Sequence, residues 1–283
     1  MLSSFVKLET AVPLILAPPR GTGHLGGLSL DALLANLASP TQVETAGCLQ
    51  SQFVSSLVCL DAFAQTPSGT NLASAIDAFR LIEITSNNTK PVKAVVLQMR
   101  SEIIKGHTQK FTDELIHWIK SHNFSSVILL TSFDAFKRTD AQIQSGDLLR
   151  FFAPHPISAS LHQRCTQLGW TPLEPFERVE EMKSSSSSSP KFPLESGLTE
   201  RIYDALVDPS SSISPPIPTL VLSWFTPAEG FHFQQALGMA QAVNQFLELK
   251  SNGTLVLVLN FIIEVSYHLI RFVICSNHHR YIS

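Results

Sequence analysis

The chain has 283 residues, of which 44% are hydrophobic and 15% are charged. This length and composition allow one large domain or two small ones around a sizeable apolar core. The formal net charge of −3 supplies no overall basic field, so the composition gives no support to nucleic-acid binding. The four cysteines are scattered without a CxxC or Cys/His cluster, which indicates neither a zinc site nor a disulfide framework and fits a reducing compartment.

The first expected element is a strand at residues 11–17, AVPLILA, followed by a glycine-bearing turn and a helix. Lys7 and Glu9 precede the apolar run and no clear cleavage site follows it, so we interpret the run as a strand and not as a signal peptide. Pro40 ends the helix, whose apolar stripe is made of leucines: Leu25, Leu28, Leu30, Leu33, Leu34 and Leu37.

Short apolar runs at residues 57–60 and 79–84 are expected to form the next strands. A cluster of turn-forming residues at 87–91 then leads directly into another apolar run at 94–99. This arrangement predicts a hairpin between 79–84 and 94–99.

Residues 94–139 predict a βαβ crossover, around which the chain is organised. The runs 94–99 and 127–132 are short and rich in Val, Ile and Leu, which is typical of buried strands. The helix between them has an apolar face consisting of Phe111, Leu115, Ile116, Trp118 and Ile119. Because parallel strands joined by a helix imply a right-handed connection, we expect an α/β fold with a mostly parallel central sheet flanked by helices.

The ends of this helix also carry signals. Thr108 or Thr112 is expected to cap the start, because threonine side chains accept hydrogen bonds from free backbone N–H groups. We expect Asp113 and Glu114 in the first turn and Lys120 in the last, which matches the sign of the helix dipole.

The second half of the chain predicts a further strand and three helices. A helix at 158–168 is expected to end at Gly169, and a shorter one is expected at 199–206. A buried strand at 219–225 and a helix at 230–249 complete the sheet layer.

Two serine- and proline-rich stretches lack packing signals. We interpret residues 177–196 as a flexible loop insertion and residues 208–218 as a stiff polar connector. Neither stretch has strong independent folds on both sides, so residues 1–249 are predicted to be a single domain.

Residues 250–283 form an atypical apolar tail. As a membrane span it is poor, because Glu264 and Arg271 would each cost about 3 kcal/mol in a bilayer. The remaining interpretations are a strand or helix packed on the domain, or an altered end of the gene product. No membrane association is expected.

Gly21, Gly23 and Gly26 fit the dinucleotide fingerprint GxGxxG after a strand and before a helix. Against this, prolines interrupt the turn, and the ribose-binding acid expected about 20 residues further on is missing at positions 40–42. A nucleotide-binding α/β enzyme is therefore the alternative hypothesis. The favoured explanation is that the glycines let the chain turn closely into a packed helix.

The sequence contains no arrangement that indicates catalysis or metal binding. A GxSxG nucleophile elbow is missing, and the acids and histidines that stand out have no interpretable spacing: Asp61, Asp134, Asp140, His117, His278 and His279. We therefore expect no catalytic residue, cofactor or metal.

The loops after the two central strands are the most function-like places, because open parallel sheets bind at their carboxyl ends. Aromatic and arginine residues there would suit a protein contact. The alternative for Phe133 and Phe136, given about even weight, is that both pack beneath the loop. The interaction candidates are Arg100, Ser101, Phe133, Phe136, Arg138 and Asp140.

Four segments resemble the proteasome assembly chaperone 2 family. They are a strand end with Leu97, Gln98, Arg100 and Ser101; a helix with Leu115, Trp118, Ile119 and Lys120; a loop with Phe136, Arg138 and Asp140; and a first helix with Gly23, Leu25 and Asp31–Leu34. The resemblance covers roughly residues 11–249 and explains the glycines without a dinucleotide.

The resemblance implies a chaperone without catalytic activity in the cytoplasm and nucleus. Family members pair with proteasome assembly chaperone 1, and the heterodimer holds proteasome α-subunits while the α-ring of the 20S core particle forms, blocking wrong ring dimerisation. Some relatives insert a C-terminal hydrophobic-Tyr-any-residue tail between α-subunits. This chain ends Arg280, Tyr281, Ile282, Ser283, so its tyrosine stands one place too early for that tail.

Overall fold

The computed structural model describes residues 2–3, 8–19, 22–37, 42–55, 59–60, 72–73, 75–83, 91–153, 156–174, 192, 196–208, 215–227, 230 and 232–249. The tail at 250–283 and most of the two serine-rich stretches therefore lie outside the described residues. The single-domain assignment stays a prediction.

The described strands are β1 (Leu2–Ser3), β2 (Val12–Leu16), β3 (Val43–Gln50), β4 (Cys59–Leu60), β5 (Leu72–Ala73), β6 (Ile76–Ile82), β7 (Val92–Met99), β8 (Phe124–Asp134), β9 (Leu149–Phe152), β10 (Thr171–Pro172) and β11 (Thr219–Thr226). Within the described residues, nine of them form one mixed sheet in the order β1-β3-β6-β7-β2-β8-β11-β9-β10, and β4 and β5 form a separate pair.

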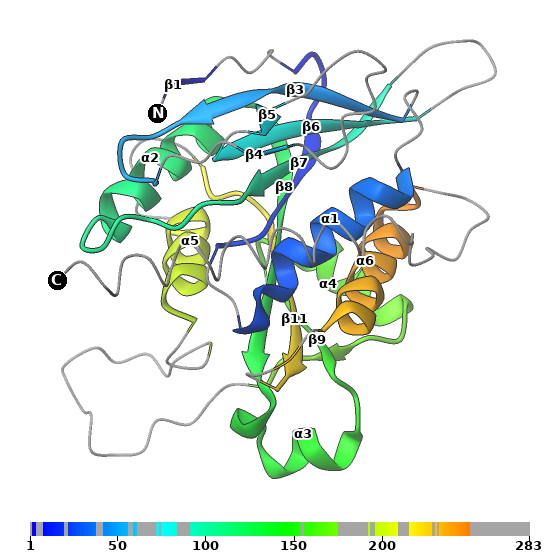
Figure 1. Ribbon diagram of the computed structural model, residues 1–283. Coiled ribbons are helices and arrows are strands. Elements are labelled where there is room, and N and C mark those ends of the chain that lie inside the picture. Colours follow the sequence, from blue (N-terminus) through cyan, green and yellow to red (C-terminus); the bar gives the residue numbers. More distant parts are fainter. Residues whose placement is uncertain are drawn as a thin grey trace, which may run out of the picture.

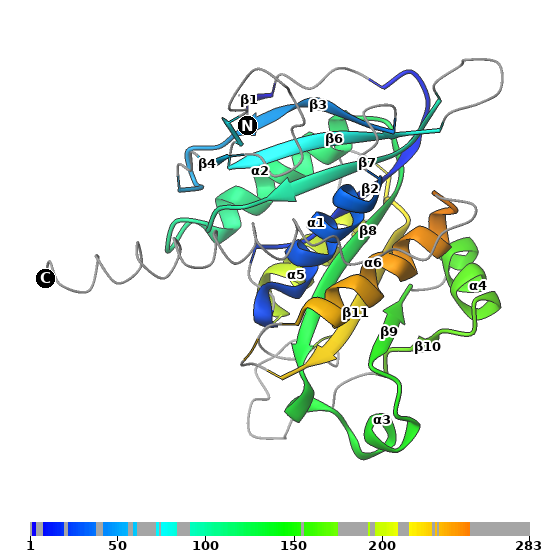
Figure 2. The ribbon, with the colours of Figure 1, turned by 45° about the vertical axis from the view of Figure 1, so that its right-hand side comes forward.

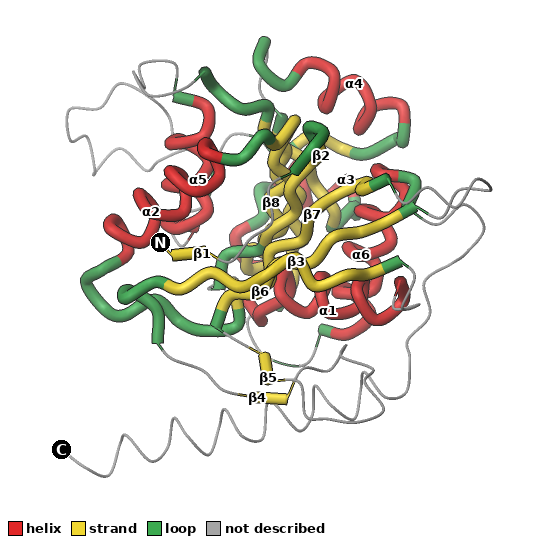
Figure 3. Tube along the Cα trace, turned by 90° about the horizontal axis from the view of Figure 1, so that it is seen from above, coloured by secondary structure: helices red, strands yellow, loops and turns green. Residues whose placement is uncertain are grey.

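The helices are α1 (Leu25–Leu37), α2 (Thr108–Ser121), α3 (Asp140–Ser145), α4 (Ala159–Gln167), α5 (Gly197–Val207) and α6 (Phe233–Leu247). Two short 3-10 turns, η1 (Thr22–His24) and η2 (Ala135–Lys137), follow β2 and β8. Figure 3 shows α2 and α5 on one face of the sheet and α1 and α6 on the other. The α/β fold, with a sheet flanked by helices, is confirmed.

The core has two layers, one on each face of the sheet. In β2, Leu14 and Leu16 pack in the layer with α2 and α5, whereas Ile15 packs in the layer with α1 and α6. All three side chains are fully buried. Alternation along a strand explains this pattern, since a strand covered on both faces must be apolar at every position.

The predicted crossover is confirmed, with one addition. β7 and β8 are both parallel to β2, and β2 lies between them. β11 continues the parallel group beside β8. The predicted hairpin is also confirmed, because β6 pairs antiparallel with β7.

The predicted start of α2 is wrong. The N-cap position is occupied by His107 and not by a threonine, and the Thr112 hydroxyl instead donates to the Thr108 carbonyl at 2.9 Å. Asp113 and Glu114 lie beyond the first turn, because the helix already begins at Thr108. Lys120 does lie in the last turn, as predicted.

Gly26 allows α1 to lie directly on the sheet. A Cβ atom at this position would stand 2.7 Å from the Leu130 carbonyl oxygen of β8 and 3.0 Å from the Ala17 Cβ. In the preceding turn, the Ser132 hydroxyl donates to the Thr22 carbonyl at 2.6 Å. These contacts support the packing explanation for the glycines. Gly21 lies outside the described residues.

Candidate protein-interaction site

A short arm follows β8 and projects from the sheet. The arm consists of residues 135–147, which form η2, α3 and the turn leading into β9. Figures 1 and 2 show it extending beyond the lower end of β8, away from the helices that cover the sheet.

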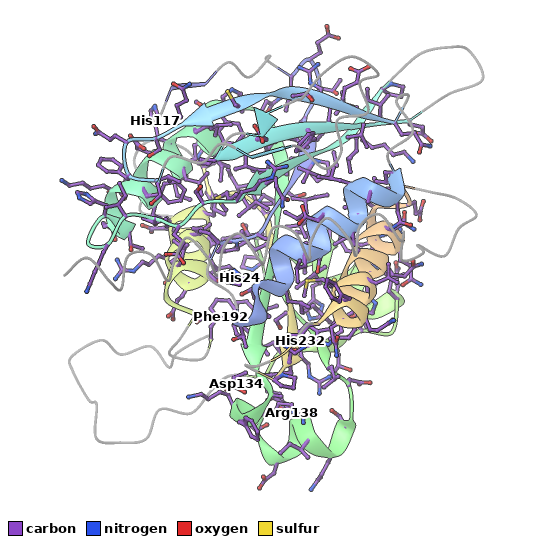
Figure 4. All side chains as sticks on the ribbon, viewed as in Figure 1. His24, His117, Asp134, Arg138, Phe192 and His232 are labelled. Carbon is purple, nitrogen blue, oxygen red and sulfur yellow. The ribbon has the colours of Figure 1, made fainter. Side chains whose placement is uncertain are left out.

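The first turn of the arm is fixed by local hydrogen bonds. The Asp134 carboxylate accepts from the Phe136 backbone N–H at 3.0 Å, which is an N-cap for η2. The Arg138 side chain Nε donates to the Ala135 carbonyl at 3.1 Å, so this half-buried arginine closes the turn from its other end. Figure 4 shows Asp134 and Arg138 together at the start of the arm.

The helix of the arm has strong signals at both of its ends. Thr139 and Gln142 form a reciprocal capping box at the N-terminus. At the C-terminus Gly146 has φ +74°, a left-handed conformation that glycine adopts without strain. The sequence analysis did not predict this helix, although the T-x-x-Q pattern and the glycine were the signals for it.

Large apolar side chains of the arm face the solvent. Phe136 is 89% exposed and Ile143 is 53% exposed, and they are two of the three large hydrophobic residues that are exposed in the described part of the chain. Sequence reasoning selected Phe136 and missed Ile143, which stands alone among polar residues. Asp140, in the first turn of α3, is exposed beside them.

Phe133 does not belong to this surface, which corrects its choice as an interaction candidate. It is only 3% exposed and lies in β8 with its ring centroid 6.0 Å from that of Phe225 and 6.2 Å from that of Phe192. Because Phe133 is still part of the strand, its side chain points into the layer covered by α5. The alternative that the phenylalanines pack beneath the loop is right for Phe133 alone.

Arg100 and Ser101 stand apart from the arm. Arg100 forms an ion pair with Asp77 of β6 and lies 5.9 Å from the Phe79 ring centroid, so it holds the β6–β7 hairpin. The Ser101 side chain is buried. Figures 1 and 2 show β7 running across the view and β8 down it, and the two carboxyl ends diverge. The two predicted loops therefore do not form one site, because β2 separates their strands and the sheet twists.

Within the described residues, we found no group of three or more His, Cys, Asp or Glu side chains that could hold a metal ion. The helices described are all too short or too polar to cross a membrane. His117, which the sequence analysis left without a role, lies exposed on α2, far from the arm (Figure 4).

Comparison with known proteins finds relatives that share one name. No model of a known protein family matches the chain. Proteasome assembly chaperone 2 of Nematostella vectensis is 27% identical over 243 residues, which is 85% of this chain and 91% of the relative. The protein of the same name from Homo sapiens is 26% identical over 235 residues, covering 83% and 81%.

A solved structure shares the fold. Pyrococcus furiosus PbaA, described as an archaeal homologue of proteasome-assembly chaperone, matches with a TM-score of 0.56 and 14% identity over 94% of this chain and 92% of that chain. The chain thus has the α/β fold seen in proteins of the proteasome-assembly-chaperone type. In sequence it is similar to the proteins named proteasome assembly chaperone 2, which confirms the resemblance of its motifs.

Proposed function

We propose that the chain is a chaperone for assembly of the 20S proteasome core particle and acts by binding proteins, not by catalysis. The observation that carries the proposal is similarity over more than four fifths of the chain to proteins named proteasome assembly chaperone 2. The arm supports it, because an exposed aromatic residue on a well-held turn is typical of a protein-binding surface.

The mechanism we propose is stoichiometric shielding. The chain pairs with proteasome assembly chaperone 1, and the heterodimer binds α-subunits, promotes α-ring formation and blocks off-pathway ring dimerisation. The proposed location is the cytoplasm and nucleus, where such subunits would be met. No nucleic acid, membrane or cofactor takes part in this proposal.

Phe136 is the proposed anchor of the contact. Full burial of an exposed phenylalanine side chain contributes about 1.5–3 kcal/mol, which is the size of an interface hot spot. Arg138 and Asp140 follow it closely in sequence, so they would supply part of the polar rim that surrounds such an anchor.

Co-expression with tagged proteasome assembly chaperone 1, affinity capture and mass spectrometry test the proposal. We expect the wild-type chain to be retained together with proteasome α-subunits. The Phe136→Ala variant should reduce capture of at least one of these partners about tenfold, equivalent to about 1.4 kcal/mol. Ile104→Ala is the matched control, because Ile104 is also exposed and apolar but belongs to the loop after β7.

The outcomes separate the protein's function from its site. Equal capture by Phe136→Ala and wild type would remove the arm from the mechanism and leave the chaperone function standing. A well-folded wild-type chain that retains neither chaperone 1 nor α-subunits would contradict the function itself.

A further inference from the structure

The arm exposes two large apolar side chains and buries a polar one. One of its two glutamines, Gln142, is fully buried, and Arg150 of the neighbouring strand β9 is only 1% exposed. Phe136 and Ile143 point outward instead. A loop that folded for its own stability would bury its apolar groups and expose its polar ones, so this arrangement needs another explanation.

Arg150 lies at the base of the arm, in the sheet. Its backbone pairs with Ser223 of β11 on one side and Thr171 of β10 on the other. Its guanidinium donates through Nη2 to the Ser145 hydroxyl, and Nη1 lies 3.5 Å from the Asp147 carboxylate. The hydrogen-bond acceptor Ser145 and the ion-pair partner Asp147 both belong to the arm, so the buried cation joins the sheet to the end of α3.

Stability alone does not account for an arginine here. Burial of a guanidinium removes its hydration, and an apolar residue of similar volume often stabilises a core as well as a buried ion pair does. Arginine provides directed hydrogen bonds that an apolar side chain lacks. Here the hydrogen bond from Arg150 to Ser145 fixes the C-terminal end of α3.

Two further tethers hold the same arm. The Thr171 hydroxyl donates to the Asp147 carboxylate at 2.7 Å, and the Thr139 hydroxyl donates to the Glu174 carboxylate at 3.1 Å. α3 has only six residues, and a helix of that length does not persist without outside contacts. The conformation that presents Ile143 therefore depends on polar tethers at both ends of α3.

We infer that Arg150 is the positioning residue of the arm, which holds α3 so that Phe136 and Ile143 meet a partner protein in their binding conformation. The inference rests on the proposed function and adds to it a buried residue that touches no partner. A binding surface that is only partly populated lowers the apparent affinity in proportion to its population. Loss of positioning should therefore slow association, whereas loss of a contact mainly speeds dissociation.

Binding kinetics distinguish these roles. Immobilised recombinant proteasome assembly chaperone 1 is one probe, and immobilised proteasome α-subunits, offered to the assembled heterodimer, are the other. On the probe that the arm contacts, Arg150→Met should lower the association rate constant about tenfold and change the dissociation rate constant less than twofold. Phe136→Ala should instead raise the dissociation rate constant about tenfold.

The controls address folding and charge. Arg164→Met removes an arginine of α4 whose ion pair with Glu248 is remote from the arm, and it should leave both rate constants unchanged. Arg150→Lys keeps the charge without the fork of donors and should recover part of the association rate. Ser145→Ala removes the hydroxyl that accepts the hydrogen bond from Arg150 and changes only an exposed residue of α3. If Arg150→Met fails to fold, this variant should show the same loss of association rate.

Hydrogen exchange provides a readout without a partner. The Ile143 amide donates to the Thr139 carbonyl and the Gly146 amide to the Ile143 carbonyl. Both should exchange at least tenfold faster in Arg150→Met, while the amides of β8 should not change. Normal exchange in the arm, or unchanged association on both probes, would overturn the inference and leave the proposed function intact. If the wild-type chain binds neither probe, the proposed function fails, and this inference fails with it.

Discussion

Gly26 and Gly27 are neighbours on α1, yet they have opposite surroundings. A Cβ atom on Gly26 would press against the Leu130 carbonyl, whereas one on Gly27 would meet no described atom within 4 Å. The sheet therefore restricts the residue at position 26 to glycine, whereas at position 27 only the helix propensity of the residue matters.

The pair gives a matched prediction. Gly26→Ala should lower the free energy of unfolding by about 1–3 kcal/mol, because the backbone oxygen it meets cannot move aside. Gly27→Ala should raise it by up to about 1 kcal/mol, since alanine favours a helix more than glycine does. Urea denaturation of both variants checks this, and a Gly26→Ala protein as stable as wild type would contradict the close packing of α1.

Cys165 of α4 is fully buried beside Phe151 and Phe246 in the layer that contains α6. Burial raises the pKa of its thiol from 9.0 to about 12, because a thiolate would lose its hydration. Burial also raises the pKa of the Tyr203 phenol above its ordinary value. In the unfolded chain both groups lose their protons at lower pH.

Alkaline pH should therefore destabilise the protein. Between about pH 9 and pH 12 the unfolded state binds fewer protons than the folded state, so the free energy of unfolding falls as the pH rises. Urea denaturation at pH 8, 9 and 10 measures the slope. Cys165→Ala should have a shallower slope, and Tyr203→Phe reports the contribution of the phenol. A Cys165→Ala slope equal to that of wild type would contradict a buried neutral thiol.

At the scale of elements, length and periodicity decided which ones the sequence could predict. The sequence predicts β2, β8, β11 and α1 because each is a continuous apolar run or carries a repeated apolar stripe. The six-residue α3 has no such repeat, and its evidence lies only in its caps. The sequence places the start of α2 too late because Thr108 and Thr112 both have the chemistry of a cap, whereas the fold puts His107 at the N-cap position.

Thr139 tests how much the cap of α3 contributes. Thr139→Ala removes the side-chain acceptor of the Gln142 amide and the bond to Glu174, and should cost the arm about 0.5–2 kcal/mol. Faster hydrogen exchange at the Ile143 amide would report it. Thr166→Ala is the control, because that exposed hydroxyl only bonds within α4 and its loss should change stability by less than about 0.5 kcal/mol.

At the scale of the whole molecule, β2 joins the two parts of the sheet. Leu14 pairs with Val95 of β7 on one side and with Val127 of β8 on the other. The next residue, Ile15, is fully buried between the two strands. Within the sheet, the antiparallel strands β3 and β6 are joined to β8 and β11 through β7 and β2.

Ile15→Ala tests whether these parts unfold together. The cavity should lower the free energy of unfolding by about 2–5 kcal/mol. The described fold predicts a single transition that is the same by circular dichroism and tryptophan fluorescence, because the seam belongs to both parts. Two separate transitions would show two independent domains and contradict the single-domain prediction.

The position of β2 also explains what the sequence could not predict about the site. The sequence correctly placed the ends of β7 and β8 as loops of parallel strands, but it did not show that a third strand lies between them. Nor could it distinguish Phe133 from Phe136, since two phenylalanines three positions apart look alike until the strand is known to end at Asp134. The end of β8 at Asp134 decides that Phe133 is buried and Phe136 is exposed.

The central place of β2 sets an order for synthesis. A ribosome releases β2 well before β7 and β8, the strands with which it pairs, so its ladder stays open while most of the central sheet is still being translated. α1 emerges with it and has no β8 carbonyl to rest on until residue 130 has appeared. The nascent chain therefore carries the apolar strand β2 unpaired until β7 and β8 have been made, and we expect this interval to be the stage of synthesis at which the chain is most prone to aggregate.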